Sequence, residues 1–320
     1  MKTFKKHPLQ LLIASSLTAL VACGGSSSDS GGTNDSSDTT GSFNLAVTDA
    51  AIDSANHVFV EFSGVSIQPA DGEVIEFTFE EAKQIDLLAL QGSASQDLVA
   101  GEEVPTGDYE WIRLHVNAEA DGVSDSYIEM TDGSQLELWV PSGSQTGLKL
   151  VSGFTVTANT GADFTIDFDL RKSVVLPPAQ QIGGAILKPA LRLIDNTASG
   201  TISGSVDGTL MSEQCADPAT QTGAVYVFTG ADATVSDVRG TESDPMTTAL
   251  VSEVEGGYGY EVGFLDEGDY TLAYTCGASA DDPEAEDSLT FVGTANATVE
   301  ADTTTEVNFA SDAEASADAL

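Results

Sequence analysis

The sequence predicts an all-β protein, in which two β-sandwiches in series follow an export signal and a disordered spacer. Hydrophobic residues alternate with polar ones in many short segments, and turn residues separate these segments. A period of two is typical of antiparallel strands with one buried face. Only Glu80–Leu90 has the pattern of a helical turn or two.

The chain begins with a leader typical of exported proteins. Three lysines precede an apolar run over residues 9–22, which is shorter than the roughly 20 residues of a membrane-spanning helix. Leu20-Val21-Ala22-Cys23 resembles the lipobox of bacterial lipoproteins. This resemblance implies a signal peptide over residues 1–22, cleavage before Cys23, a lipid on its thiol and a fatty acid such as palmitate on its new amine. An ordinary secretory signal shares the charged start and the apolar core.

A lipid at Cys23 would tie the protein to a membrane. Each buried methylene contributes about 0.8 kcal/mol, and durable attachment takes more than one acyl chain. Gly24 follows the cysteine, so the aspartate typical of inner-membrane retention is absent. We expect a lipid-anchored protein of the Gram-negative outer membrane, facing the periplasm or the cell surface. Residues 23–41 lack hydrophobic residues after the cysteine and predict a flexible spacer.

The composition is strongly acidic. Three of the 11 basic residues precede Cys23 and all 51 acidic residues follow it, so eight basic residues face 51 acids in the exported chain, which leaves it near −43. This charge repels nucleic acid and excludes it as a partner. Solubility in salty surroundings explains acids spread along the whole chain, and cation binding is the alternative reading.

The remaining cysteines predict one disulfide. Cys215 and Cys276 are the only two beyond Cys23, and an even pair in an exported protein is typical of a disulfide. Two buried thiols are the alternative. A zinc site lacks the neighbouring ligands that it needs.

Residues 42–196 predict the first sandwich. Asp71-Gly72 and Asp132-Gly133 separate alternating segments and indicate hairpin turns. The strands are expected around these alternating residues: Phe43 to Val47, Val58 to Phe62, Val74 to Phe79, Ile112 to Val116, Leu136 to Val140 and Phe164 to Phe168.

A series of sequence blocks in this region resembles the bacterial family called domain of unknown function 4382. The resemblance implies an exported, often lipid-anchored β-sandwich and no established activity or catalytic residues. The blocks that carry it are Leu45–Ala50, Ile85–Leu88, Val104–Tyr109, Ile112–Leu114, Val140–Ser142 with Gly147–Leu150, Asp167–Ser173 and Leu187–Arg192.

Residues 199–310 predict a second sandwich, and residues 311–320 a frayed tail. Thr201 to Leu320 holds 24 acidic residues and a single basic one, Arg239. Gly200–Gly204 and the Gly268-Asp269-Tyr270 corner resemble carboxypeptidase regulatory-like or transthyretin-like domains.

The two sandwiches share a short motif. Val104-x-x-Gly107-Asp108-Tyr109 and Leu265-x-x-Gly268-Asp269-Tyr270 have identical spacing. Glycine allows the turn into the strand, and a buried tyrosine needs a backbone partner for its hydroxyl. We therefore expect a structural role for the motif and one type of sandwich in both halves.

The sequence offers no catalytic set. Beyond the leader, His57 and His115 are the only histidines, and no Gly-x-Ser-x-Gly elbow occurs. We expect both histidines to be surface or packing residues and the protein not to be an enzyme.

Several acids offer a calcium alternative to a salt-linked sheet face. Asp167 and Asp169 emerge opposite Phe168 on one strand, and Asp49 and Asp53 could add oxygen ligands, of which calcium takes six to eight. No Asp-x-Asp-x-Asp-Gly loop is present. Nearly all of the first domain's basic residues lie in the blocks that resemble the family and suggest internal salt bridges or a pocket for an acidic ligand: Arg113, Lys149, Arg171, Lys172, Lys188 and Arg192.

Two tryptophans offer a sugar-binding alternative. Trp139 and Trp111 are out of phase with the neighbouring buried residues, which predicts either packing against another layer or a surface for stacking sugars. The sequence thus predicts an outer-membrane lipoprotein that acts as a non-enzymatic binding or scaffolding module, with a protein or glycan partner at the envelope and no cofactor. The alternatives are a calcium- or carbohydrate-binding adhesion factor and, third, an enzyme of unrecognised type.

Overall fold

The structure is a computed structural model that describes residues 39–50, 52, 55–141, 147–175, 184–188, 190–217 and 222–311. The signal peptide, Cys23, most of the spacer and residues 312–320 lie outside the described residues. Asp38–Leu320 forms one unit by its internal contacts. No helix within the described ranges is long and apolar enough to cross a membrane.

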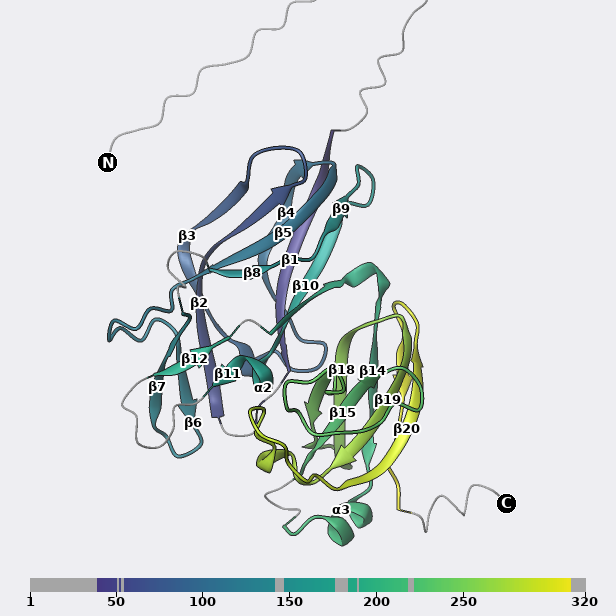
Figure 1. Ribbon diagram of the computed structural model, residues 1–320. Coiled ribbons are helices and arrows are strands. Elements are labelled where there is room, and N and C mark those ends of the chain that lie inside the picture. Colours follow the sequence, from purple (N-terminus) through teal and green to yellow (C-terminus); the bar gives the residue numbers. More distant parts are fainter. Residues whose placement is uncertain are drawn as a thin grey trace, which may run out of the picture. The chain divides into compact units, whose positions relative to one another are not determined.

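Two sheets form the first sandwich (Figure 1). The smaller sheet has the strand order β13 (Leu191–Asp195), β10 (Ala162–Asp169), β1 (Thr40–Ala50) and β4 (Gln96–Pro105). The larger sheet has the order β11 (Val174–Val175), β12 (Ala185–Leu187), β7 (Gln135–Trp139), β6 (Tyr127–Met130), β2 (Ala55–Pro69), β5 (Gly107–Val116) and β8 (Leu148–Leu150). In addition, β3 (Ile75–Asp86) pairs with β2, and β9 (Phe154–Val156) pairs with β5.

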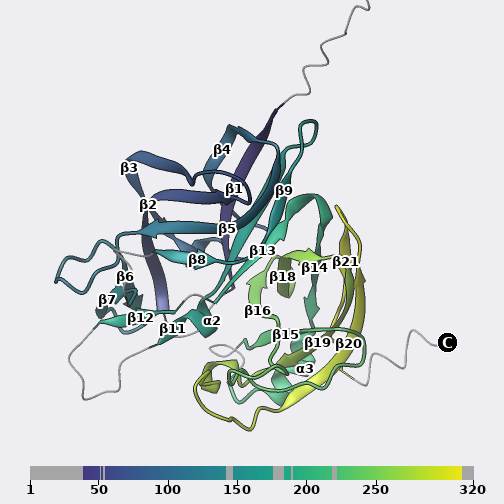
Figure 2. The ribbon, with the colours of Figure 1, turned by 45° about the horizontal axis from the view of Figure 1, so that its top comes forward.

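The second sandwich has two four-stranded sheets (Figure 2). One has the order β17 (Ser252–Val254), β18 (Gly257–Asp266), β14 (Ser199–Val206) and β21 (Thr304–Glu306). The other has the order β16 (Thr247–Leu250), β15 (Ala224–Thr229), β19 (Gly268–Thr275) and β20 (Phe291–Val299). Short helices connect the strands: η1 (Leu87–Ala89), α2 (Leu170–Ser173), η2 (Asn196–Ala198), α3 (Gly208–Gln214) and η3 (Ala278–Ala280).

The predicted all-β fold is therefore confirmed, and alternation builds its cores. Phe43, Leu45 and Val47 on β1 are fully buried, as are Ile112 and Val60 from the facing sheet. They belong to one hydrophobic cluster, whereas the buried residues of the second sandwich form two further clusters. The expected likeness of the second sandwich to carboxypeptidase regulatory-like or transthyretin-like domains stays a prediction.

Two sequence expectations need correction. Helical turns were expected over Glu80–Leu90, but β3 continues through Asp86, paired with β2, and only η1 is helical. Purely antiparallel sheets were expected, but β1 pairs in parallel with β10, and β14 with β21. Parallel strands need a long crossover connection, and the alternation within each strand gives no information on the direction of its partner.

The predicted hairpins are confirmed. Asp71-Gly72 lies between β2 and β3, and Asp132-Gly133 between β6 and β7. Gly72 and Gly133 have φ values of 144° and 81°, a region that favours glycine. The loops contain residues 70–74 and 131–134, so both are longer than two-residue turns.

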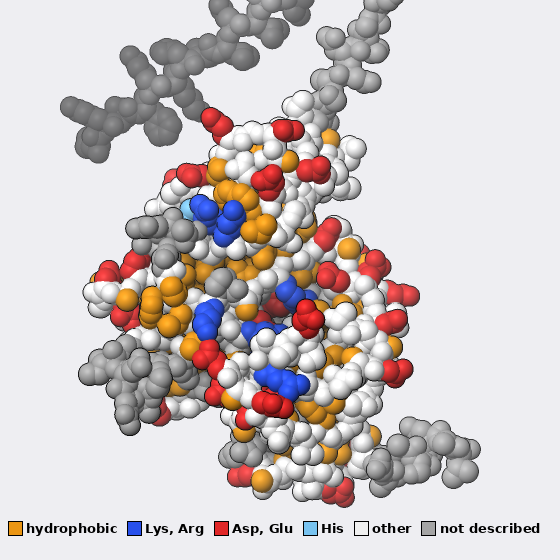
Figure 3. Space-filling model, in the orientation of Figure 1, with side chains coloured by type: hydrophobic (Ala, Val, Ile, Leu, Met, Phe, Trp, Pro, Cys, Tyr) orange, Lys and Arg blue, Asp and Glu red, His pale blue; other side chains and the backbone are white. Residues whose placement is uncertain are grey.

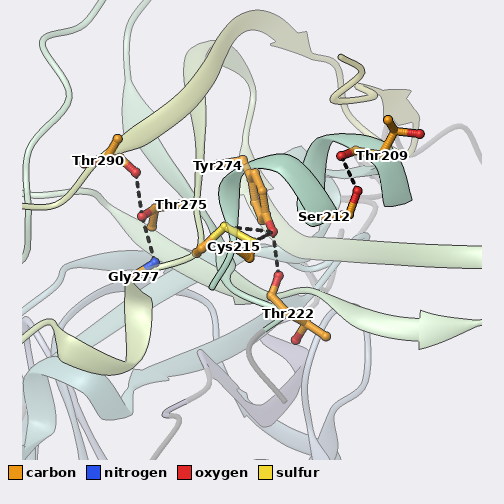
Figure 4. The surroundings of a disulfide bond; sticks show 9 residues. Thr209, Ser212, Cys215, Thr222, Tyr274, Thr275, Gly277 and Thr290 are labelled. Atoms are coloured by element: carbon orange, nitrogen blue, oxygen red, sulfur yellow. Dashed lines mark hydrogen bonds between the residues drawn. A yellow bond between two sulfur atoms is a disulfide. The ribbon is translucent and has the colours of Figure 1, made fainter. Parts of the chain in front are cut away.

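The predicted disulfide joins Cys215, after α3, to Cys276, after β19 (Figure 4). The Tyr274 hydroxyl lies 3.3 Å from the Cys215 sulfur and donates to the Thr222 carbonyl at 2.8 Å. Burial raises the pKa of Tyr274 to about 12. The crosslink closes a sequence separation of 61 residues, for which restriction of the unfolded chain contributes about 4 kcal/mol.

The repeated Gly-Asp-Tyr motif adopts the same structure in both sandwiches. The Tyr109 hydroxyl donates to the Pro105 carbonyl at 2.8 Å, and that of Tyr270 to the Asp266 carbonyl at 2.7 Å. Each hydroxyl thus reaches the carbonyl four residues earlier, which ties the buried ring to the preceding strand.

The aspartates of the motif are equivalent as well. Asp108 accepts from the Thr155 hydroxyl and Asp269 from the Thr298 hydroxyl, both at 2.7 Å. In each case the threonine lies on the neighbouring strand of the second sheet. The expected structural role of the motif is therefore confirmed.

The tyrosine corners predict matched losses of stability. Tyr109→Phe and Tyr270→Phe should each lower the free energy of unfolding by about 1 kcal/mol, because the ring stays packed while the backbone carbonyl loses its donor. Urea unfolding followed by circular dichroism measures both. Tyr127→Phe is the control, because the half-buried Tyr127 makes no hydrogen bond through its hydroxyl to a described residue. Equal stability of all three variants would contradict the prediction.

Candidate functional site

A cavity of about 590 Å³ lies where β1 and β10 of the first sandwich meet β14, β16 and β18 of the second. The first sandwich contributes Thr48, Asp49, Gln91, Gly92 and Asp167 to its lining. The second contributes hydroxyl, carboxylate, amide and apolar groups, among them Ser203, Ser205, Thr247, Thr248, Tyr260, Glu261, Val262, Glu306 and Asn308.

Strand alternation decides which side chains face this cavity. Thr48 and Asp167 are register partners on the parallel pair β1–β10, so their side chains leave the sheet on the same side. Asp49 is paired with Phe168 and continues the buried series that ends in Val47. Its side chain therefore belongs to the interior face of the first sandwich, and Asp49 only borders the cavity.

Arg192 holds Asp167 in place. Its Nη2 and Nε atoms donate to the same carboxylate oxygen at 2.7 and 3.1 Å, from the directly paired position on β13. Nη1 of Arg192 lies 3.4 Å from the Met246 sulfur of the second sandwich. The predicted salt-linked sheet face is therefore present, and it continues into a contact between the sandwiches.

Lys172, directly after the end of β10, likewise links an aspartate of the first sandwich to the second sandwich. Asp169 accepts from the Lys172 backbone amide at 3.2 Å and pairs with its ammonium group at 2.9 Å. The same ammonium group donates to the Pro245 carbonyl of the second sandwich at 2.6 Å. Burial raises the pKa of Asp169, and the charge of Lys172 acts in the opposite direction.

Two further cations complete the contact between the sandwiches. Arg171 is buried and donates to the Ala278 carbonyl at 2.9 Å, and its guanidinium lies over the Tyr226 ring. Lys188 pairs with Glu284 at 2.7 Å. Four of the eight basic residues beyond the leader thus contact the second sandwich. The sequence showed that these residues are scarce and grouped, but not that their partners lie about 50 to 110 residues away in the second sandwich.

Asp49 is a buried carboxylate without a hydrogen-bond donor. It is 5% exposed, and neither carboxylate oxygen has a hydrogen-bond partner among the described residues. Burial raises its pKa well above the ordinary value, and the charges of Asp167 and Asp169 raise it further. The Leu170 amide lies near enough to lower the pKa, but no hydrogen bond of normal geometry reaches either oxygen.

The calcium ligands expected from sequence are only partly gathered. Asp49, Asp167 and Asp169 lie on the adjacent strands β1 and β10, and Asp53 lies outside the described residues. Arg192 and Lys172 already neutralise Asp167 and Asp169. Asp49 emerges on the other face, so the three carboxylates do not converge on one point, and calcium at this set stays a prediction.

A different trio of carboxylates does converge. Ligand atoms of Asp237, Asp281 and Asp287 lie within 4.8 Å of one another, the only such group among the described residues. Asp281 accepts from the Tyr226 hydroxyl, and Asp237 accepts from the Asp287 amide. Protein donors therefore already serve this cluster. Sequence reasoning missed it because its members come from two loops about 50 residues apart.

The histidines do not form a catalytic site. His57 pairs with Asp86 at 2.6 Å, and this hydrogen bond raises its pKa. Nε2 of His115 lies 2.6 Å from the Ser66 hydroxyl, which is the distance of a nucleophile–base pair. Ser66 is only 1% exposed, however, and no carboxylate among the described residues bonds to the other ring nitrogen of His115.

The two tryptophans differ in their surroundings. Trp111 is half-buried, and the side chains of Arg113 and Lys149 lie over its ring at 4.8 and 4.5 Å from the centroid. Two cations thus cover the face of the ring that sugar stacking, one of the two alternatives, would use. Trp139 is half-buried on β7, paired with Ile186 of β12. Sugar binding at either tryptophan stays a prediction.

The unpartnered carboxylate of Asp49 predicts a pH-dependent effect of its removal. Asp49→Asn should raise the free energy of unfolding at pH 7–8. The pKa of Asp49 is higher in the folded protein than in the unfolded chain. As the pH rises from about 4, the unfolded chain therefore loses its proton first, and the native state loses stability until the pH passes the folded-state pKa. Each unit of raised pKa corresponds to about 1.4 kcal/mol at the alkaline end of this window.

Urea unfolding of both proteins between pH 4 and pH 8 measures this effect. The advantage of Asp49→Asn should shrink toward pH 4, where both states of the wild-type chain hold the proton. Asp71→Asn removes the same charge from an exposed hairpin turn and should be neutral. A variant that is less stable than wild type at pH 8 would show that Asp49 has a stabilising partner.

Comparison with solved structures finds only weak likeness. A leucine-rich repeat protein from Bacteroides thetaiotaomicron is 12% identical with a TM-score of 0.19, over 84% of this chain and 26% of that one. The Bacillus anthracis TIE protein is 10% identical with a TM-score of 0.18, over 85% and 34%. The minor pilin of Streptococcus agalactiae is 11% identical with a TM-score of 0.19, over 83% and 94%.

The chain thus spans about a quarter and a third of the length of the first two proteins. These TM-scores are too low to assign a role to the chain, and no curated relative matches it. The family model described as "Domain of unknown function (DUF4382)" matches residues 40–189, which is the region of the first sandwich. The protein therefore carries, over residues 40–189, a domain of the DUF4382 family.

Proposed function

We propose that the protein is a lipid-anchored lipoprotein of the outer membrane that acts as a non-enzymatic binding module, with its ligand in the cavity between β1, β10 and the second sandwich. The observation that carries this proposal is the cavity itself. At about 590 Å³ it falls in the size range of sites for small molecules.

The cavity lining supports binding rather than catalysis. It contains no lysine, arginine, histidine or cysteine among the described residues, so it offers neither a nucleophile–base pair nor a cationic stabiliser for a developing anion. Serine and threonine hydroxyls, the Asn308 amide and the carboxylates of Asp167, Glu261 and Glu306 offer hydrogen bonds to a polar ligand. The sugar residues of an envelope glycan have this chemistry.

The anchor supports an envelope location. Lipidation at Cys23 would leave a spacer of 16 residues, 24–39, before β1 begins at Thr40. A flexible chain of this length has a root-mean-square reach of about 20–25 Å, which would let the folded body meet partners away from the lipid surface.

A calcium- or carbohydrate-dependent adhesion role is the alternative. The converging carboxylates of Asp237, Asp281 and Asp287 favour the calcium version, because calcium takes oxygen ligands. The calcium version differs from the main proposal in one measurable property, which is that binding would require the ion.

Filling the cavity should abolish binding. Ser203 follows the buried Ile202 on β14 and lines the cavity. Ser203→Phe should therefore lower retention on a glycan array at least tenfold without a change in melting temperature. Ser212→Phe, on the exposed face of α3, is the matched control. Binding that survives in Ser203→Phe would place the ligand elsewhere, and binding that chelation removes would favour the calcium version.

Removing the anchor should release the protein. Cys23→Ser should abolish incorporation of labelled fatty acid and move the chain from the membrane fraction to the soluble fraction after cell lysis, because no thiol remains to carry lipid. Cys215→Ser is the control that removes a cysteine of the folded body. Membrane attachment that persists in Cys23→Ser would contradict the lipid anchor, and protease shaving of intact cells measures which side of the membrane the protein faces.

A further inference from the structure

Six of the seven cations of the first sandwich divide into two groups, and the seventh, Lys83, donates to the carbonyls of Asp97 and Leu98. Arg171, Lys172, Lys188 and Arg192 bind partners in the second sandwich. Arg113 and Lys149 make no ion pair with any described residue, although the chain has 51 acidic residues and a formal charge of −40. Figure 3 shows that the Lys and Arg side chains form only a few patches on the drawn face of the molecule.

Arg113 and Lys149 lie directly opposite each other. They are register partners on the antiparallel strands β5 and β8, where like charges destabilise the pair. Both side chains lie over the ring of Trp111, at 4.8 and 4.5 Å from its centroid. The tryptophan face attracts both cations, so it holds two positive charges together against their repulsion.

The donors of this pair have no hydrogen-bond acceptor in the part of the chain that the structure describes. The Nε atom of Arg113 is buried there without a partner, and no hydrogen bond to a described residue is made by the rest of its guanidinium or by the Lys149 ammonium. Nearby polar groups do not satisfy them. His115 is bonded to Ser66, and Glu76 lies near enough to affect the pKa of His115 but makes no ion pair with Arg113.

We propose that Arg113 and Lys149, held by Trp111, bind an oxyanion: a phosphate, sulfate or carboxylate group of a ligand. The planar fork of arginine matches two oxygens of such a group, and lysine adds a point charge. An oxyanion between the two cations replaces their repulsion by two charge-assisted hydrogen-bonding contacts. This site goes beyond the cavity of the proposed function. It takes an anionic group on the sheet that holds β5 and β8, whereas carboxylates line the cavity.

Fluorescence of the full-length protein tests the site. Trp139→Phe leaves Trp111 as the only tryptophan, so its emission reports on the ring that the two cations cover. Inorganic phosphate, sulfate and D-glucuronate are the probes, each titrated at constant ionic strength so that screening does not change. At least one probe should give a saturable change in emission.

In the same background, Lys149→Gln and Arg113→Gln should each weaken that binding roughly 10- to 100-fold, the range for loss of a hydrogen bond to a charged group. Lys188→Gln removes an equal charge from an exposed ion pair and should leave binding unchanged. Lys149 is exposed, so its variant tests the site even where Arg113→Gln disturbs the fold.

Saturation by phosphate and sulfate alone supports a tetrahedral oxyanion, and saturation by glucuronate alone supports an acidic sugar. No saturable change with any probe, or equal affinity in Lys149→Gln and wild type, would overturn the oxyanion site. Loss of cavity binding in Ser203→Phe leaves this titration unaffected, so the two proposals fail separately.

Discussion

The ion pair of Arg192 with Asp167 lies where the first sandwich contacts the second. It lies between paired positions of β10 and β13, and the same guanidinium reaches Met246 of the second sandwich. A largely buried pair of this kind is weak evidence for stability, but removing one partner leaves an uncompensated charge that costs about 3–5 kcal/mol. The pair therefore fixes position, and Lys172 and Arg171 extend it with donors to carbonyl groups.

Backbone carbonyls of the second sandwich accept hydrogen bonds from two of these cations, Arg171 and Lys172. A cation that sits on backbone carbonyls leaves its charge available to offset the surrounding acids, such as Asp281 beside Arg171. Arg113 and Lys149 differ, because their side chains make no hydrogen bond to a described residue. Six of the eight basic residues beyond the leader thus lie at two places, the contact between the sandwiches and the Trp111 surface.

The two sandwiches share more than their tyrosine corners. In each sandwich the first strand lies between an antiparallel strand that leads into the corner and a parallel strand from later in the chain. In the first sandwich, β1 lies between the antiparallel β4 and the parallel β10. In the second, β14 lies between the antiparallel β18 and the parallel β21. The strand after the corner crosses to the other sheet in both. This common order, with equivalent hydrogen bonds at Tyr109 and Tyr270, is consistent with duplication of one unit.

The sequence by itself determined the strands around its alternating residues, the hairpins, the corners and the pairing of Cys215 with Cys276, because period-two burial, turn chemistry and cysteine number are local or countable properties. Strands without strict alternation, such as β4, were not predicted. It also placed Asp167 and Asp169 on one face, since alternation along a single strand needs no partner. Only the tertiary structure decided that Asp49 lies at the end of the buried face of β1 and that β10 runs parallel to β1. It also decided which cations contact the second sandwich. These depend on residues about 50 to 120 positions apart, which the order of residues along the chain does not bring together.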